Sequence, residues 1–246
     1  MVLNAQEAQM TPIKKLVDLW DNEQVRQIRI IPENDPLVSL NYFPEKIIIS
    51  PQYFIQGLDG ALPDLYARER VYQQLLKAAA LLPAGYKFVI FDAWRSIATQ
   101  MALFEKMKGF VLRDHPDFDD KQVTTAARRI VALPATDIEK PSPHNTGASL
   151  DLSIADASGR LLDMGGNFDD AGAYSRTDFY EDHTDTPQDQ QAQENRRLLY
   201  QLMITAGFSN YIEEWWHFDY GNQNWAYALG QDHALFGAAS PKFPWI

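Results

Sequence analysis

The sequence predicts an α+β fold in which helices pack on a small, mainly antiparallel sheet, and three observations indicate it. Residues 65–82 place Val71, Leu75 and Ala79 on one face of a helix. Residues 148–154 alternate between apolar and polar side chains, and residues 211–220 are rich in aromatic residues. Both patterns are typical of strands. We expect a single domain spanning residues 1–246, which is the simplest count, although the length alone would also permit two.

The remaining elements follow from the same criteria, with prolines and turn residues as boundaries. In chain order, the expected helices cover residues 13–19, 65–82, 97–108, 121–132 and 189–206. The expected strands cover residues 27–31, 46–49, 86–92, 148–154 and 211–220.

A polar, acidic stretch from residue 163 to about residue 190 is longer than an ordinary connection. Loops of this kind are often lids or walls of a substrate site. A solvated insertion without a role explains the length equally well, so the sequence leaves both interpretations open.

The composition argues against several classes of function and partner. The chain has 22 Lys and Arg against 33 Asp and Glu, and its net charge of -11 disfavours nucleic acid and anionic membranes as partners. It has no cysteine, so a metal site must use nitrogen and oxygen ligands. The first ten residues do not resemble a signal peptide, and no stretch is long enough to span a bilayer. We expect a cytoplasmic protein, or a periplasmic one if a signal peptide was removed, and the oligomeric state stays open.

The most informative feature is a set of metal-binding side chains in two segments. His144 and Asp151 lie close together in the chain, and Glu214 and His217 follow much later. A catalytic zinc ion takes three protein ligands and a water, and a nearby carboxylate handles the proton of that water. We therefore predict one Zn²⁺ per chain on His144, Asp151 and His217, with Glu214 as the general base.

Backbone geometry is compatible with this set of ligands on one condition. Asp151 lies on the polar face of its strand, and Gly147 permits a turn that folds His144 over the same face. Glu214 and His217, however, would point to opposite faces of an ideal strand. The two roles therefore require a bend or an irregular backbone near Glu214.

These residues resemble a known family. Residues 142–151 and 214–217 resemble the patterns Ser-x-His-x-x-Gly-x-Ala-x-Asp and Glu-x-x-His of the VanX-type zinc D-alanyl-D-alanine dipeptidases, within the D-Ala-D-Ala metallopeptidases. Residues 91–95 resemble the Asp-x-Tyr-Arg-Pro segment of the family, and residues 163–169 resemble its Met-Gly-x-x-Phe-Asp segment. The resemblance runs over roughly residues 85–220 in the same order, which is more specific than any single motif.

The resemblance implies hydrolysis of the D-Ala-D-Ala dipeptide to free D-alanine. It implies that Arg95 stabilises the tetrahedral intermediate, for which a permanently charged, planar donor is chemically suited. It also implies that Asp169 holds the ammonium group of the substrate. A zwitterionic dipeptide needs donors for its carboxylate as well, and Ser142 is the candidate.

The chain departs from the family pattern at positions that are neither ligands nor the base. Ser149 replaces an alanine, Trp94 a tyrosine and Ser96 a proline, and residues 166–167 also differ, which leaves the exact substrate open. A peptidoglycan D,D- or L,D-carboxypeptidase or endopeptidase is therefore an alternative. A zinc-binding domain without catalysis is a further one, although a structural zinc needs neither Glu214 nor Arg95.

Other residues near the motifs have simpler explanations. Glu213 is expected to form a salt bridge or to face solvent, whereas Asp92 either does the same or orients a ligand or Arg95. One of Trp215 and Trp216 is expected in the core and the other in the wall of the substrate pocket. The remaining histidines are expected to have no direct role: His115, His183 and His233.

Overall fold

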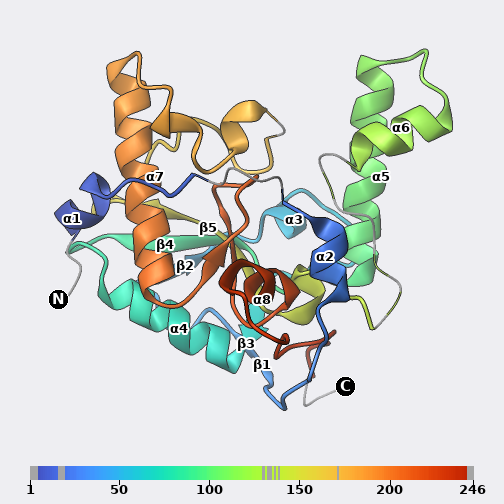
Figure 1. Cartoon of the computed structure of the whole chain (residues 1–246), viewed down its shortest axis with the longest axis horizontal. Helices are drawn as coiled ribbons and strands as arrows, with labels where there is room; N and C mark the ends of the chain where they lie inside the picture. Colours follow the sequence, from blue (N-terminus) through green and yellow to red (C-terminus); the bar gives the residue numbers. More distant parts are fainter. Residues whose placement is uncertain are drawn as a thin grey trace.

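The computed structural model describes residues 5–15, 20–128, 131, 135, 137, 139–170 and 172–242. A five-stranded sheet in the order β2-β4-β5-β7-β6 forms its centre (Figure 1). Strands β2 and β4 are parallel and the other neighbouring pairs are antiparallel, so the predicted α+β class with a mainly antiparallel sheet is confirmed. The strands of this sheet are β2 (Ile47–Ile49), β4 (Lys87–Asp92), β5 (Ser149–Ala155), β6 (Ser209–Asn210) and β7 (His217–Asp219). A separate antiparallel pair consists of β1 (Leu37–Ser39) and β3 (Tyr66–Arg68).

Helices surround the sheet, and short 3₁₀ turns interrupt the long connections. The helices are α1 (Ala5–Met10), α2 (Asn22–Gln27), α3 (Gln52–Ile55), α4 (Glu69–Ala80), α5 (Ile97–Asp114), α6 (Asp120–Ala127), α7 (Pro187–Thr205) and α8 (Gln223–Leu229). The 3₁₀ turns are η1 (His144–Thr146), η2 (Ala173–Ser175) and η3 (Phe179–Glu181). Among the described residues, no helix is both long and apolar enough to cross a membrane.

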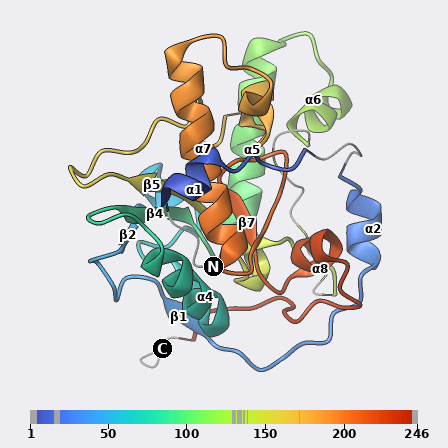
Figure 2. The ribbon, with the colours of Figure 1, turned by 60° about the vertical axis from the view of Figure 1, so that its left-hand side comes forward.

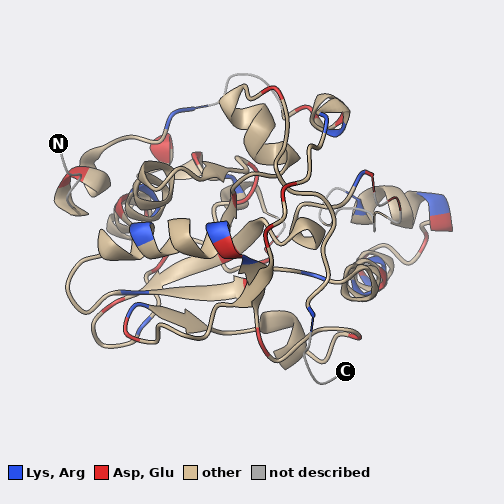
Figure 3. Ribbon diagram, turned by 90° about the horizontal axis from the view of Figure 1, so that it is seen from below, with Lys and Arg blue, Asp and Glu red and all other residues tan. Residues whose placement is uncertain are grey.

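One face of the sheet packs against α4 and α7, which lie on the same side of it (Figures 1 and 2). Leu150 and Leu152 of β5 share one apolar cluster with Leu75 of α4 and Leu202 of α7. Helix α4 is amphipathic, and in Figure 3 its charged bands lie on the side away from the strands. The polar residues of β5 alternate with the apolar ones and therefore face the opposite side of the sheet, where they are also buried.

Helices α5 and α6 pack on each other beside the sheet (Figure 1, green) and bury a smaller apolar cluster that includes Leu103 and Val123. The expected helix at 97–108 extends to Asp114. The expected helix at 121–132 ends at Ala127. Residues 129, 130 and 132 lie outside the described residues.

The predictions for the N-terminal segment are wrong where the structure describes it. Residues 13–15 are not helical, and 16–19 lie outside the described residues. The expected strand at 27–31 is replaced by the end of α2 and an isolated bridge between Ile30 and Ala234. The side chain of Asp21 accepts hydrogen bonds from the backbone N–H groups of Glu23 and Gln24, so an N-cap starts the helix α2.

The expected helix at 65–82 begins later than predicted. Residues 66–68 form β3, and α4 starts only at Glu69. Tertiary pairing with β1 overrides the helical tendency of this first turn. The strands expected at 46–49, 86–92 and 148–154 and the helix expected at 189–206 are confirmed to within a few residues.

Candidate metal centre

Three neighbouring strands place acidic and histidine side chains in one row across the polar face of the sheet. Asp151 of β5 is paired with His217 of β7 on one side and with Asp92 of β4 on the other. Two residues along the same two strands, Ser149 is paired with Asp219. Residues two apart share a face of a strand, so His217 and Asp219 both project toward this row.

His144 reaches the row from the 3₁₀ turn that precedes β5. Gly147 ends this turn in the left-handed region with φ 71°, and the N–H of Gly147 donates to the carbonyl of His144 at 3.1 Å. A Cβ atom at this position would lie 2.3 Å from Cδ2 of Leu37, so both the conformation and the space require glycine. The turn expected at Gly147 is therefore confirmed.

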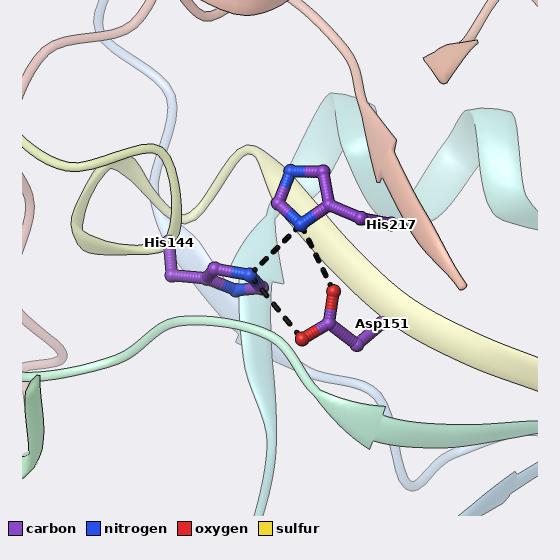
Figure 4. A group of neighbouring side chains, drawn as sticks. All are labelled: His144, Asp151 and His217. Atoms are coloured by element: carbon purple, nitrogen blue, oxygen red, sulfur yellow. Dashed lines mark hydrogen bonds and ion pairs between the residues drawn. The ribbon is translucent and has the colours of Figure 1, made fainter. Parts of the chain in front are cut away.

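His144, Asp151 and His217 converge on one point (Figure 4). Nε2 of His144 lies 3.2 Å from Nδ1 of His217 and 3.3 Å from Oδ2 of Asp151. Nδ1 of His217 lies 3.0 Å from Oδ1 of Asp151. Ligands about 2.0–2.1 Å from a tetrahedral zinc ion lie about 3.3 Å apart, so the three donor atoms have the separation that one such ion needs.

The second nitrogen of each imidazole already has a partner. Nδ1 of His144 donates to the carbonyl of Ala93 at 2.7 Å and lies 3.1 Å from Oδ2 of Asp92. Nε2 of His217 lies 3.1 Å from both carboxylate oxygens of Asp219. These contacts orient the rings and leave the nitrogens that face the row for a metal ion.

Asp219 is a residue that the sequence analysis missed. It is fully buried and also accepts hydrogen bonds from Ser149, Asn222 and Asn224. Its position two residues after His217 in a strand is the signal that could have identified it. Asp92, whose role the sequence left open, contacts both His144 and Arg95.

The carboxylates change the proton affinity of the imidazole that they surround. Burial alone would lower the pKa of His217, but the charges and hydrogen bonds of Asp219 and Asp151 raise it well above its usual value. Burial would likewise raise the pKa of Asp151, yet His144 and His217 lower it below the ordinary range. A cation bound to these donor atoms would compete with protons for them.

Glu214 lies outside the row of strands, in the loop that joins β6 to β7. The strand expected at 211–220 is interrupted here: the N–H of Glu214 donates to the carbonyl of Tyr211, and the N–H of His217 donates to the carbonyl of Glu214. This turn brings Oε2 of Glu214 to 3.8 Å from Nδ1 of His217. The irregular backbone that the two roles required is thus present.

The Glu214 side chain is 29% exposed, and it does not belong to the group of three residues that could hold a metal ion. Burial, followed by the negative charges of Asp151 and Asp169, raises its pKa to about 7, against the opposing effect of His217. A carboxylate with such a pKa can both accept and return a proton near neutral pH.

Arg95 lies beside the three candidate metal-binding residues, on the segment that follows β4. Its guanidinium donates to Asp92 at 2.7 and 2.9 Å and to Oε1 of Gln100 at 2.7 Å. Nη2 lies 3.7 Å from Oδ2 of Asp151. Burial would lower the pKa of Arg95, but the surrounding carboxylates raise it, so the cation is permanent.

A tyrosine that the sequence analysis did not identify connects Arg95 with Asp169. The Tyr53 hydroxyl accepts from Nη2 of Arg95 at 3.2 Å and donates to Oδ2 of Asp169 at 3.1 Å. Asp169 has φ 67° and is the only non-glycine residue with positive φ among those described. Burial raises the pKa of Asp169 to about 6. The structure therefore connects Asp169 to Arg95, which lies beside Asp151 of the three candidate metal-binding residues.

The structure also gives the positions of the remaining residues that the sequence singled out. Ser142 is half-buried at the start of the His144 turn, where its carbonyl accepts from the N–H of Asn145. Glu213 forms the expected salt bridge, to Arg176 at 2.6 Å. Trp215 and Trp216 both belong to the apolar core, as expected for one of them, and a place for the other in a pocket wall stays a prediction. The metal-binding group among the described residues does not include the three remaining histidines: His115, His183 and His233.

The stretch from residue 163 to 190 is folded rather than a solvated insertion. It contains η2 and η3, and Ser175, Thr177 and Tyr180 within it are buried. The N–H of Thr177 donates to the carbonyl of Ile212 at 2.8 Å, next to the Glu214 loop. This stretch therefore packs against the loop that carries Glu214.

Comparison with known proteins agrees with the geometry. Residues 64–236 match the Peptidase_M15 family, described as D-Ala-D-Ala dipeptidase. A D-alanyl-D-alanine dipeptidase of Synechocystis is 32% identical over 81% of this chain and 87% of its own length. The dipeptidase of the same name from Escherichia coli is 31% identical over 55% of this chain and 56% of its own length.

A solved structure, a mutant of the vancomycin-resistance D,D-pentapeptidase VanY in complex with Zn(II), is also similar. It is 17% identical, covers 70% of this chain and 83% of its own, and has a TM-score of 0.41. The family match covers well over half of the chain, and the Synechocystis relative aligns along most of it. The chain belongs to the Peptidase_M15 family of D-Ala-D-Ala dipeptidases and is a metallopeptidase.

Proposed function

We propose that this protein hydrolyses the D-Ala-D-Ala dipeptide to two molecules of D-alanine, with one zinc ion held by His144, Asp151 and His217. The observation that carries the proposal is the convergence of three buried donor atoms 3.0–3.3 Å apart, with the Glu214 carboxylate beside them at 3.8 Å. A site made only of nitrogen and oxygen donors is the set expected of a catalytic zinc ion. Such an ion polarises a carbonyl and acidifies a water molecule.

Glu214 is proposed as the general base. Its carboxylate lies next to the metal-binding atoms without being one of them, and its pKa of about 7 matches the task. It accepts the proton of the attacking water and then returns one to the leaving amine. The amine departs as the neutral amino group of the second D-alanine.

Arg95 is proposed to stabilise the negative charge that develops on the carbonyl oxygen. Asp92 and Gln100 hold its guanidinium in one orientation, so the side chain loses little conformational freedom when the transition state forms. Asp92 also contacts the Nδ1 side of His144 and therefore couples the cation to a metal ligand.

Asp169 is proposed to bind the ammonium group of the substrate, and Ser142 its carboxylate. The carboxylate of Asp169 is connected to Arg95 through one tyrosine hydroxyl. An ammonium partner this close to the oxyanion donor suits a substrate with only one residue before the scissile bond. The short connection between Asp169 and Arg95 therefore favours a dipeptidase over a carboxypeptidase that acts on peptidoglycan stems.

Release of free alanine, of either configuration, from a panel of substrates tests the proposal. The purified protein is assayed with zinc and after chelation, on D-Ala-D-Ala, L-Ala-L-Ala and a stem pentapeptide that ends in D-Ala-D-Ala. We expect zinc-dependent hydrolysis of D-Ala-D-Ala, with the other two substrates cleaved much more slowly. Faster cleavage of the pentapeptide would favour the carboxypeptidase, and no cleavage of any of them would contradict the proposed hydrolysis of D-Ala-D-Ala.

A further inference from the structure

Arg196 of α7 is a buried cation with an unusual set of partners. Its side chain is among the largest that are fully buried, with 2% exposure. Its guanidinium donates to three backbone carbonyls: those of Met164 at 2.7 Å, Tyr174 at 2.6 Å and Arg176 at 2.7 Å. It also lies over the rings of Tyr180 at 4.7 Å and Trp215 at 5.8 Å.

No carboxylate among the described residues forms an ion pair with this guanidinium. Asp163 and Asp178 act on it through their charge without a hydrogen bond, and burial lowers its pKa to about 10. A buried cation without a paired anion is costly for stability. Hydrogen bonds to three carbonyls and contacts with two rings take the place of the anion, so the position of these carbonyls in the chain shows what Arg196 holds.

All three carbonyls belong to the segment from Met164 to Arg176, which carries Asp169. Met164 is at its start, and Tyr174 and Arg176 are at its end, so one side chain holds both ends of the loop. Two further contacts fasten the start of the loop. Nδ2 of Asn195 donates to the carbonyl of Asp163, and the Tyr180 hydroxyl donates to the carbonyl of Gly165.

The same arginine also lies next to the loop that carries Glu214. The ring of Trp215, one residue after Glu214, faces the Arg196 guanidinium. The N–H of Trp215 donates to the carbonyl of Ser175, which lies between two of the residues that Arg196 holds. Arg196 therefore connects the Asp169 segment to α7 and, through Trp215, to the Glu214 loop.

We propose that Arg196 is a positioning residue that sets the affinity for the substrate by holding the segment from Met164 to Arg176, and hence Asp169, in place. The role rests on the proposed function of Asp169. The three carbonyls accept from three different nitrogens of the guanidinium, Nε, Nη1 and Nη2. A lysine presents all its donors from a single nitrogen, so it cannot reach the three carbonyls in their present positions. Arg196 acts through Asp169 and does not itself touch the substrate.

The variant Arg196→Lys tests the proposal, because it keeps the charge and removes the three-way contact. We expect the KM for D-Ala-D-Ala to rise by roughly tenfold or more, with a smaller change in kcat, as expected for the loss of two hydrogen bonds that hold a binding group. The ratio of kcat/KM for D-Ala-D-Ala to that for N-acetyl-D-Ala-D-Ala should decrease. Hydrogen exchange of the amides in residues 164–176 should become faster, whereas the zinc content stays at that of the unmodified protein.

The matched control is Arg197→Lys. Arg197 is the next residue on α7, but it pairs with the carboxylate of Glu181 and makes no contact with the three carbonyls. A lysine can keep that ion pair, so KM and exchange in residues 164–176 should stay unchanged. A milder variant, Asn195→Ala, removes one contact at the start of the loop and should shift both readouts in the same direction by less.

Hydrogen exchange separates failure of this inference from failure of the proposed function. If the unmodified protein does not cleave D-Ala-D-Ala, faster exchange in Arg196→Lys still supports the positioning of the segment, and the proposed function alone fails. Unchanged exchange and unchanged KM in Arg196→Lys would overturn the inference. Faster exchange with an unchanged KM would overturn its link to affinity. If Arg196→Lys does not fold, the Asn195→Ala result decides by the same criteria.

Discussion

Asp151 and His217 face each other directly across β5 and β7, with Oδ1 and Nδ1 3.0 Å apart. The pairing register alone fixes this relationship, because a shift by one residue would turn either side chain to the apolar face. A metal ion bound to both residues would therefore bridge two adjacent strands of the central sheet. Its binding is expected to stabilise the fold, since a ligand that binds only the native state favours that state.

The first prediction concerns the ligands. His144→Ala should lose stoichiometric zinc, and its melting temperature should become insensitive to added zinc. The control is His183→Ala, because His183 is exposed and lies outside the metal-binding group. Elemental analysis and thermal unfolding with and without zinc measure the difference. Full zinc occupancy in His144→Ala would contradict the assignment.

Asp219 provides a second prediction. Asp219→Asn should weaken zinc binding by roughly 10–100-fold, the usual scale for a carboxylate that orients a histidine ligand. An asparagine keeps the size of the side chain, but its NH2 group would face the amide donor of Asn222 or Asn224, so thermal unfolding of the variant is measured alongside zinc binding. Competition with a chelator of known affinity measures the change. An unchanged affinity would show that Asp219 has only a structural role.

A third prediction distinguishes transition-state from ground-state binding by Arg95. Arg95→Lys keeps a cation but not the planar contacts to Asp92 and Gln100. We expect kcat to fall by roughly 10²–10³, the scale for removing one oxyanion donor, with a small change in KM. Steady-state kinetics decide the point. A raised KM with a normal kcat would instead make Arg95 a substrate-binding residue.

The fourth prediction follows from the pKa of Asp169, which burial raises to about 6. An ammonium group is held by the ionised carboxylate, which forms as the pH rises above 6. The ratio of kcat/KM for D-Ala-D-Ala to that for its N-acetyl derivative should therefore rise between about pH 5 and pH 7. The ratio cancels the titration of groups that act on both substrates. Asp169→Asn should remove the rise, and a ratio independent of pH in the unmodified protein would contradict this role.

Much of the fold follows from local sequence. Apolar and polar residues alternate along residues 149–155, as in a strand, and apolar residues recur with a helical period along residues 187–205. Both elements lie close to their predicted bounds. The N-terminal segment was predicted wrongly, because short elements there depend on one N-cap at Asp21 and on pairing with distant residues such as Ala234. Boundaries such as the start of α4 depend on the partner strand β1, which local propensity does not reveal.

The candidate site was partly visible in the sequence. His144, Asp151, His217 and Glu214 stand in compact motifs, and the structure brings them together. Tyr53, by contrast, lies in a short helix that is distant in the sequence from every motif, so no spacing pattern connects it with Asp169. Long-range partners of this kind are fixed by tertiary packing. The single-domain organisation and the cytoplasmic location stay predictions.

The most direct test of the central claim separates the proposed base from the metal ligands. The variant Glu214→Gln is analysed for zinc content and for hydrolysis of D-Ala-D-Ala, with Glu213→Gln as the neighbouring control. We predict that Glu214→Gln binds one zinc ion per chain as tightly as the unmodified protein and loses activity by roughly a hundredfold or more, whereas the control changes little. Loss of zinc from Glu214→Gln, or full zinc with full activity, would contradict the account.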